Sequence, residues 1–290
     1  MPFEVRAPGK LFVLGEYAVT DGAPALVLAV DRGVRCSVAP GDALLTPGDD
    51  RFARAALEAV GAPARTYRFS NWNPPKLRSK AGFGGSAAAC TAGVIAGTLA
   101  AGGPVDEALC ELAVRTHQRV QGSGSGMDVR ASFHGGLRWY EGAQVGAPEP
   151  VLAVTAVYSG SSASTGPRVV RYKAWSGREP FVDQSRALKG LWQEDPLAAM
   201  REGLRLLTHM SRQAGVAYLT PGLERIIALA TEHGGAAKPS GAGGGDVAVA
   251  WVPDPDARAS FEAACTLEGL PVLPIQTAPG AKETGHGADA

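Results

Sequence analysis

Glycine is concentrated in three short segments of this chain, and these segments constrain the fold more than any other feature. The 290 residues include 38 glycines, which are densest at 82–86, 122–126 and 241–245. Each glycine costs backbone entropy on folding, so clusters are expected where the backbone turns sharply or approaches a ligand closely. Successive backbone N–H groups in such loops form concavities that bind anions. The clusters therefore predict backbone-lined sites for a small anion.

The patterns between these clusters indicate a mixed fold. Short alternating runs, broken by Gly and Pro, predict strands over residues 3–40 and near 137–140, 151–160, 246–252 and 271–275. Helical patterns cover residues 51–61, 86–100, 106–121, 185–213 and 220–233, and one more helix separates the last two strands. Because strands are grouped at the start, an α+β fold suits the chain better than a doubly wound parallel sheet. The polar tail after Gly280 is expected to fray.

Composition excludes several classes of partner. Lys+Arg and Asp+Glu both number 28, and this neutral balance argues against bulk electrostatic binding to nucleic acid or to a membrane surface. The four cysteines lack the Cys-x-x-Cys spacing of a zinc site and suggest no disulfide framework. No run approaches the roughly 20 apolar residues of a membrane span. We expect a cytoplasmic protein, a monomer or homodimer, whose partner is a small molecule.

The segment KAGFGGS at 80–86 comes directly before a predicted helix. The N–H groups and the dipole at a helix N-terminus attract phosphate, so this loop is predicted to hold a polyphosphate. Gly82, Gly84 and Ala87 also satisfy the loose dinucleotide-binding pattern, but no strand precedes them. The only Gly-Lys pair, Gly9-Lys10, lacks the Ser or Thr that a Walker A motif requires. The nucleophile elbow of α/β-hydrolases is absent as well.

Three segments in order along the chain resemble the signature motifs of the GHMP kinase superfamily. They are APGKLFVLGEYAV at 7–19, KAGFGGSAAA at 80–89 and KPSGAGGGD at 238–246. The resemblance implies an N-terminal domain like ribosomal protein S5 domain 2 over 1–150 and a ferredoxin-like C-terminal domain over 151–290. ATP and an acceptor would meet between them. One departure concerns the second motif, which usually reads Gly-Leu-Gly-Ser-Ser, because Gly85 replaces its first serine.

Further details are similar to the phosphomevalonate kinase family. QGSGSGMDVRAS at 121–132 resembles that family's segment leading to an aspartate, and SGSSAST at 159–165 resembles its acceptor loop. The aspartate that ends GAGGGD is another point of similarity. The expected reaction is the ATP-dependent phosphorylation of 5-phosphomevalonate to the diphosphate in the isoprenoid pathway.

The resemblance implies roles for individual residues, with ATP and Mg²⁺ as cofactors. Asp128 would orient or deprotonate the acceptor oxygen, and Lys10, expected in a turn, would stabilise the charge that develops on transfer. Ser86 would coordinate Mg²⁺, although a serine there also suits a helix N-cap. The nucleotide phosphates would contact Lys80, Gly82, Gly84, Gly85, Ser86 and Ala87.

The acceptor would be bound by two segments from the C-terminal half. Their predicted contacts are Ser161, Ser162, Ser164, Thr165, Lys238, Ser240, Gly241, Gly243 and Gly244, helped by Arg130 or Arg168. Glu16 and Tyr17 are expected in the wall of the acceptor pocket. Asn71, Trp72 or Asn73 would lie beside adenine, and His117 and His134 receive no role.

Several alternatives remain open. Mevalonate kinase shares the fold and phosphorylates an alcohol, and a related ATP-dependent decarboxylase or sugar kinase is more distant. A non-catalytic nucleotide- or metabolite-binding regulator could keep the pocket, but the presence of Lys10, Ser86 and Asp128 together argues against it. An RNA-binding module with an S5-like fold is disfavoured by the zero net charge.

Overall fold

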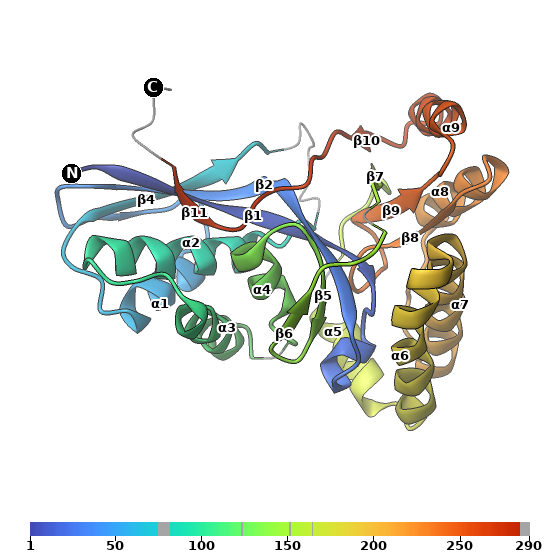
Figure 1. Ribbon diagram of the computed structural model, residues 1–290, viewed down its shortest axis with the longest axis horizontal. Helices are drawn as coiled ribbons and strands as arrows, with labels where there is room; N and C mark the ends of the chain where they lie inside the picture. The colour runs from blue at the N-terminus through green and yellow to red at the C-terminus, as the bar shows by residue number, and fades with distance from the viewer. Residues whose placement is uncertain (75–81, 123, 151, 164, 285–290) are drawn as a thin grey trace.

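The structure is a computed structural model that describes residues 1–74, 82–122, 124–150, 152–163 and 165–284. Its N-terminal half is a seven-stranded sheet with helices packed on one face (Figure 1). Strand β1 (Phe3–Leu14) lies between β11 (Lys282–Thr284) and β2 (Ala25–Ala39). Strand β2 continues the sheet to β4 (Thr66–Trp72) and β3 (Leu44–Leu45), and also pairs with the hairpin of β5 (Leu137–Glu141) and β6 (Gln144–Gly146).

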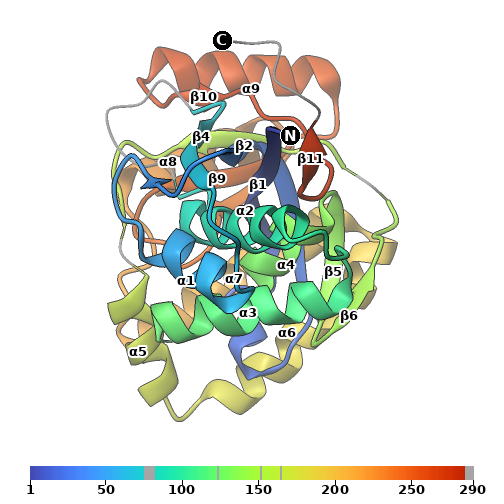
Figure 2. The ribbon, with the colours of Figure 1, turned by 90° about the vertical axis from the view of Figure 1, so that its left-hand side faces the viewer.

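Four helices cover this sheet. They are α1 (Arg51–Ala59), α2 (Gly85–Ala100), α3 (Glu107–Gln121) and α4 (Met127–His134), and Figure 2 shows α2 between the sheet and α3. Helix α2 is buried on nearly all sides because it consists mainly of alanine, glycine and other small residues. Its small side chains allow α1 and the sheet to approach closely, which fixes the position of its N-terminus.

The C-terminal half is a four-stranded antiparallel sheet with its own helices. Its strand order is β10 (Val272–Leu273), β7 (Thr155–Tyr158), β9 (Val247–Trp251) and β8 (Ala236–Pro239). The helices are α5 (Gly166–Ala174), α6 (Arg178–Glu194), α7 (Pro196–Ala214), α8 (Pro221–Glu232) and α9 (Pro255–Leu267). A short 3₁₀ helix, η1 (Ala18–Asp21), follows β1.

The two halves share a hydrophobic core. Its largest cluster combines Leu11 and Leu14 of β1 with Met200 of α7, and Trp139 of β5 packs edge-on against Trp192 of α6 at 6.5 Å between ring centroids. Two further clusters lie under the N-terminal sheet and between α8, α9 and the C-terminal sheet. Because apolar side chains from both halves exclude water together, the halves are held in a defined relative position.

The end of the described chain returns to the N-terminal sheet. Thr277 bridges to Val30, Pro279 bridges to Gly135, and β11 pairs antiparallel with β1. The expectation that the chain frays after Gly280 is therefore wrong for residues 282–284, because the exposed edge of β1 supplies backbone partners. The domain boundary expected at residue 150 stays a prediction.

The helix predicted over 185–213 is two helices. Asp195 ends α6 and caps α7, and its carboxylate accepts from the backbone N–H groups of Leu197 and Ala198. Pro196 lacks an N–H and suits the first turn of α7, so an Asp-Pro pair begins a new helix here. Helix α5 and the first turns of α6 were not predicted.

No helix in the described part of the chain is long and apolar enough to cross a membrane.

Candidate active site

The three glycine segments meet at one cavity between the halves, with a volume of about 410 Å³. The cavity is lined from β1, from the loop before α2, from the start of α4, from the loop before α5 and from residues 240–246. Twelve of the predicted site residues line it: Lys10, Glu16, Tyr17, Gly82, Gly84, Ser86, Asp128, Ser162, Thr165, Ser240, Gly241 and Gly243.

The loop before α2 adopts the backbone that its glycines permit. Gly82 and Gly84 have φ angles of +71° and +76°, which most other residues adopt only with strain. The carbonyl of Phe83 accepts a hydrogen bond from the backbone N–H of Lys10 at 2.9 Å, so the loop is fastened to β1. Gly84 is the N-cap of α2. Because glycine has no side chain, it cannot accept hydrogen bonds from the first backbone N–H groups of the helix. Those N–H groups are the donors that a phosphate would use.

Three helices begin at the cavity in the same manner. The N-caps of α2, α4 and α5 are Gly84, Gly126 and Thr165, and within the described structure none makes a side-chain capping hydrogen bond. Among the other helices, the N-caps of α3, α7, α8 and α9 accept such bonds, whereas those of α1 and α6 do not. Three positive helix ends around one cavity favour an anionic ligand.

Ser86 has a partner that the sequence analysis missed. Its Oγ lies 3.2 Å from Nε2 of His117, a buried residue of α3 that stacks on Phe52 with 4.9 Å between ring centroids. The helix α3 therefore orients the hydroxyl through an imidazole held by packing. Sequence spacing could not reveal this contact because the two residues are 31 positions apart.

Lys10 lies inside strand β1, not in the predicted turn. Its Nζ donates to the carbonyl of Gly82 at 3.4 Å. Burial lowers the pKa of Lys10, and the negative charges of Asp128, Asp246 and Glu16 oppose that shift. The lysine therefore faces carboxylates from three different segments across the cavity.

The structure corrects the prediction for Lys238, which was expected to contact the acceptor. Lys238 is completely buried, and its ammonium donates to Glu16 Oε1 and to the carbonyl of Pro239 at 2.9 Å. Burial lowers the pKa of Lys238, and the Glu16 carboxylate opposes this shift. The ion pair instead joins the third motif to the end of β1.

Two more contacts hold the third motif against the first. Ser240 Oγ accepts from the backbone N–H of Phe12 at 2.8 Å, and Tyr17 donates its hydroxyl proton to the carbonyl of Ala242 at 2.7 Å. Glu16 and Tyr17 both line the cavity, as expected. The first and third motifs, more than 200 residues apart in sequence, thus form one wall.

Asp246 also lines the cavity and had no predicted role. Its Oδ1 accepts from Ser162 Oγ at 3.1 Å and from the backbone N–H of Ala163 at 3.4 Å. Burial raises the pKa of Asp246, against the hydrogen bonds from Ser162 and Ala163 and the charges of Lys10 and Arg168. Asp246 was visible in the sequence as the end of the third motif. The residues that it contacts lie in the distant loop at 159–163, so its role could not be inferred from the motif.

Other predicted residues lie beside the cavity without lining it. Gly85 and Ala87 belong to the first turn of α2, Ser161 accepts from the backbone N–H of Asp246, and Gly244 packs against the Arg168 guanidinium. Lys80 and Ser164 lie outside the described residues.

Arg130 does not help bind an acceptor in this arrangement. It is buried and pairs with Glu107 and Glu111 of α3. Asn71 and Trp72 belong to β4, while the Asn73 amide donates to the carbonyl of Asp31 at 2.9 Å. None of these four residues is among those that line the described cavity.

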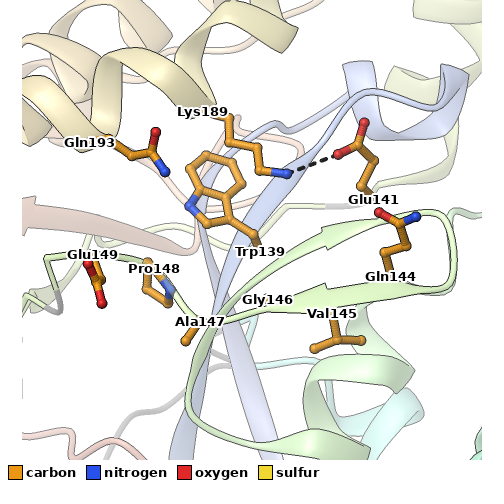
Figure 3. Close-up of a pocket in the computed structure, with 10 residues that line it drawn as sticks. All are labelled: Trp139, Glu141, Gln144, Val145, Gly146, Ala147, Pro148, Glu149, Lys189 and Gln193. Carbon is orange, nitrogen blue, oxygen red and sulfur yellow. Dashed lines mark hydrogen bonds and ion pairs between the residues drawn. The ribbon is translucent and has the colours of Figure 1, made fainter.

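A smaller pocket of about 160 Å³ lies between the β5–β6 hairpin and α6 (Figure 3). Lys189 of α6 and Glu141 of β5 form an ion pair across it at 3.0 Å. Trp139 is its largest side chain, and the remaining lining residues bring together no glycine loop or paired carboxylates of the kind found in the larger cavity. The larger cavity is therefore the candidate active site.

Two domain models of one enzyme family match the chain. The model described as GHMP kinases N terminal domain matches residues 53–136, and the model described as GHMP kinases C terminal matches residues 193–269. Together the matches cover more than half of the chain. The chain belongs to the GHMP kinases. This result confirms the resemblance and the predicted α+β fold, and it identifies the chain as a phosphotransferase.

Comparison with individual proteins leads to the same family. A phosphomevalonate kinase from Streptomyces sp. (strain CL190) is 29% identical to this GHMP kinase, over 94% of this chain and 96% of that protein. The structure of Streptococcus pneumoniae phosphomevalonate kinase in complex with phosphomevalonate and AMPPNP has a TM-score of 0.81 at 18% identity, covering 96% of this chain and all of that one.

Two other solved structures share the fold. A Lin0012 protein from Listeria innocua has a TM-score of 0.89 at 22% identity, covering 98% of this chain and 99% of that one. The L. major mevalonate kinase in complex with R-mevalonate has a TM-score of 0.72 at 21% identity, covering 95% and 96%.

Proposed function

We propose that this GHMP kinase transfers the γ-phosphoryl group of ATP to the phosphate of 5-phosphomevalonate, which yields ADP and 5-diphosphomevalonate. The observation that carries the proposal is that Lys10, Ser86, Asp128 and the hydroxyls of Ser162 and Thr165 line one cavity. The similarity to the Streptomyces phosphomevalonate kinase over nearly the whole length of both chains supports this acceptor.

The residues present fit a nucleoside triphosphate. The uncapped start of α2, with Gly82 and Gly84 in left-handed conformations, offers backbone N–H groups to phosphate oxygens. Ser86 lines the same space, so its hydroxyl would hold Mg²⁺. When bound, the metal would neutralise charge on the phosphates.

The side chains supply positioning and charge. Transfer forms a bond between γ-phosphorus and an acceptor phosphate oxygen and breaks the bond from γ-phosphorus to the β–γ bridging oxygen, so ADP leaves. The Lys10 ammonium stabilises negative charge on the transferring group. A phosphate monoester has its second pKa near 6, so most acceptor molecules are already dianionic at neutral pH. Asp128 therefore acts mainly by orienting the acceptor, with less need to remove a proton.

The test is an ADP-release assay with Mg·ATP, in which mevalonate and 5-phosphomevalonate are offered separately. We expect turnover with 5-phosphomevalonate, and a loss of about 10²-fold in kcat for Asp128→Asn, because a misplaced acceptor costs about that much. Asp183→Asn is the matched control, because Asp183 is exposed on α6 and pairs only with its neighbour Arg186 in the described structure.

The other outcomes separate the alternatives. Turnover with mevalonate alone would keep the family and overturn the acceptor, which would make this chain a mevalonate kinase. ATP binding without turnover of either acceptor would favour the regulator.

A further inference from the structure

We propose that Asp246 is a positioning residue for phosphoryl transfer, whose carboxylate holds the acceptor loop in place and keeps the Lys10 ammonium charged beside Gly82. The kinetic part of its test rests on the proposed function, whereas the measurement of Lys10 protonation does not. Acceptor loop here means residues 159–163.

The backbone of Asp246 has a left-handed conformation that is uncommon for a residue with a side chain. Its φ angle is +58°, and among the described non-glycine residues only Tyr17 and Asn73 also have positive φ. A conformation of this kind persists where the surroundings over-determine it, and it concentrates at functional sites. Here the surroundings are identifiable, because both the main chain and the side chain of Asp246 are bound to the acceptor loop.

Four hydrogen bonds connect Asp246 with that loop. Its backbone N–H donates to Ser161 O at 2.7 Å, and its carbonyl accepts from the N–H of Ser159 at 2.8 Å. Its Oδ1 accepts from Ser162 Oγ at 3.1 Å and from Ala163 N at 3.4 Å. The side chain therefore fixes the half of the loop that lines the cavity.

The same side chain also lies against the phosphate-binding loop at Gly82. A Cβ on Gly82 would lie 2.8 Å from Asp246 Cβ and 2.9 Å from its Oδ2. Lys10 Nζ donates to the carbonyl of this glycine at 3.4 Å. Gly82 is thus the point where the first, second and third motifs meet, and its missing side chain leaves room for the carboxylate.

Charge connects Asp246 to Lys10. Lys10 loses hydration by burial, and the groups that favour its protonated form are Asp128 from α4, Asp246 from the third motif and Glu16 from the end of β1. Asp246 in turn faces Lys10 and Arg168 of α5. Neutralising Asp246 removes one of three carboxylates that keep Lys10 protonated, so the pKa of Lys10 falls further.

Two substitutions separate the charge of Asp246 from its hydrogen bond with Ser162. Asp246→Asn keeps an acceptor at Oδ1 and tolerates the left-handed backbone, but it removes the charge. Ser162→Ala removes one donor to Oδ1 and leaves the charge. Asp183→Asn, on the exposed face of α6, controls for charge removal as such.

We expect Asp246→Asn to lower kcat and to move the alkaline limb of its pH profile to lower pH by about one unit, because Lys10 must be protonated to act. Ser162→Ala should raise KM for the acceptor by about 3–10-fold, the worth of one hydrogen bond, without moving that limb. KM for ATP should stay near the parent value in both variants.

A second readout does not depend on the acceptor. Titration of ¹³Cε-lysine resonances by NMR, with the Lys10 signal assigned from Lys10→Arg, measures its protonation directly. A lower pKa of Lys10 in Asp246→Asn than in the parent supports the proposal even if neither acceptor is turned over. An unshifted Lys10 titration overturns it, as does a parent-like kcat with an unmoved alkaline limb.

Discussion

At the scale of single residues, the site depends on charges that are removed from water. Glu16 and Lys238 form an ion pair with both side chains almost fully buried, and the second oxygen of Glu16 has no hydrogen-bond partner within the described structure. Burying two charges costs several kcal/mol for each ion, which their attraction only partly offsets. The pair is retained beside a cavity where the Glu16 charge also acts on Lys10. The pair therefore contributes more to the charge of the site than to the stability of the fold.

The first prediction concerns this pair. Lys238→Met leaves the Glu16 carboxylate buried without its cation, and we expect the free energy of unfolding to fall by about 3–5 kcal/mol. The double variant Glu16→Gln/Lys238→Met removes both charges and should recover much of that loss. Urea unfolding followed by circular dichroism measures all three proteins. Additive losses in the double variant would contradict the interpretation.

At the scale of elements, α2 shows how a helix can be positioned by residues that have almost no side chain. A Cβ on Gly93 would lie 2.7 Å from the Cβ of Ala56 in α1, and one on Gly97 would lie 2.6 Å from Cγ2 of Val60. These contacts are closer than real Cβ atoms allow. The two glycines therefore set the distance between α1 and α2, and with it the position of the phosphate-binding end of α2.

The second prediction compares two glycines in helix interiors. Alanine is the better helix former by about 0.8–1.0 kcal/mol, so Gly190→Ala in α6, where a Cβ meets nothing within 4 Å, should stabilise the protein by that amount. Gly93→Ala gains the same propensity but overpacks against Ala56, at a cost of about 1–3 kcal/mol, so the net change should be destabilising. Thermal unfolding of both variants provides the comparison. Equal stabilisation by both would show that α1 and α2 can move apart freely.

At the scale of the whole molecule, the halves are joined by their shared core and by a polar contact beside the cavity. Asp21 of η1 accepts from Lys173 Nζ and from the Tyr172 hydroxyl of α5, each at 2.7 Å. Burial acts to raise the pKa of Asp21, but the hydrogen bonds from Lys173 and Tyr172, with the charges of Lys173 and Arg178, outweigh it and lower the pKa. This contact holds the start of the C-terminal half against the end of β1.

The third prediction concerns the dependence of this contact on pH. A carboxyl whose pKa is lower in the folded state stabilises fully above its unfolded value of about 3.9, and this contribution is lost as pH falls through the folded pKa. We expect Asp21→Asn to destabilise the protein by about 1 kcal/mol at pH 7, after allowing for the partial exposure of the pair. The difference between variant and parent should shrink below about pH 4.

Urea midpoints of the parent and of Asp21→Asn at matched pH values test this sign. A difference that grows on acidification would contradict it. Asp183→Asn serves again as the control, and as a surface substitution it should change stability by no more than about 0.5 kcal/mol at pH 7.

Much of the site was predictable from the sequence because its determinants are local. The glycines at 82 and 84 permit positive φ wherever they occur, and the alanine-rich run after Ser86 forms a helix by its own propensity. Most predicted helices agree with the structure to within one or two residues at each end, apart from the one that divides at Asp195. Lys10, Ser86 and Asp128 were identified from the motifs that contain them, and all three line one cavity.

The third motif shows what only the tertiary structure decided. From the sequence, Lys238 was assigned to the acceptor and Asp246 had no role, yet Lys238 is buried against Glu16, whereas Asp246 lines the cavity and binds the acceptor loop. Likewise, His117 reaches Ser86, and the end of the chain pairs with β1. The sequence by itself determined the motifs, because backbone freedom and helix propensity belong to neighbouring residues. Burial and pairing between segments 31 to 280 residues apart depend on how the sheets and helices pack, so only the folded chain decided them.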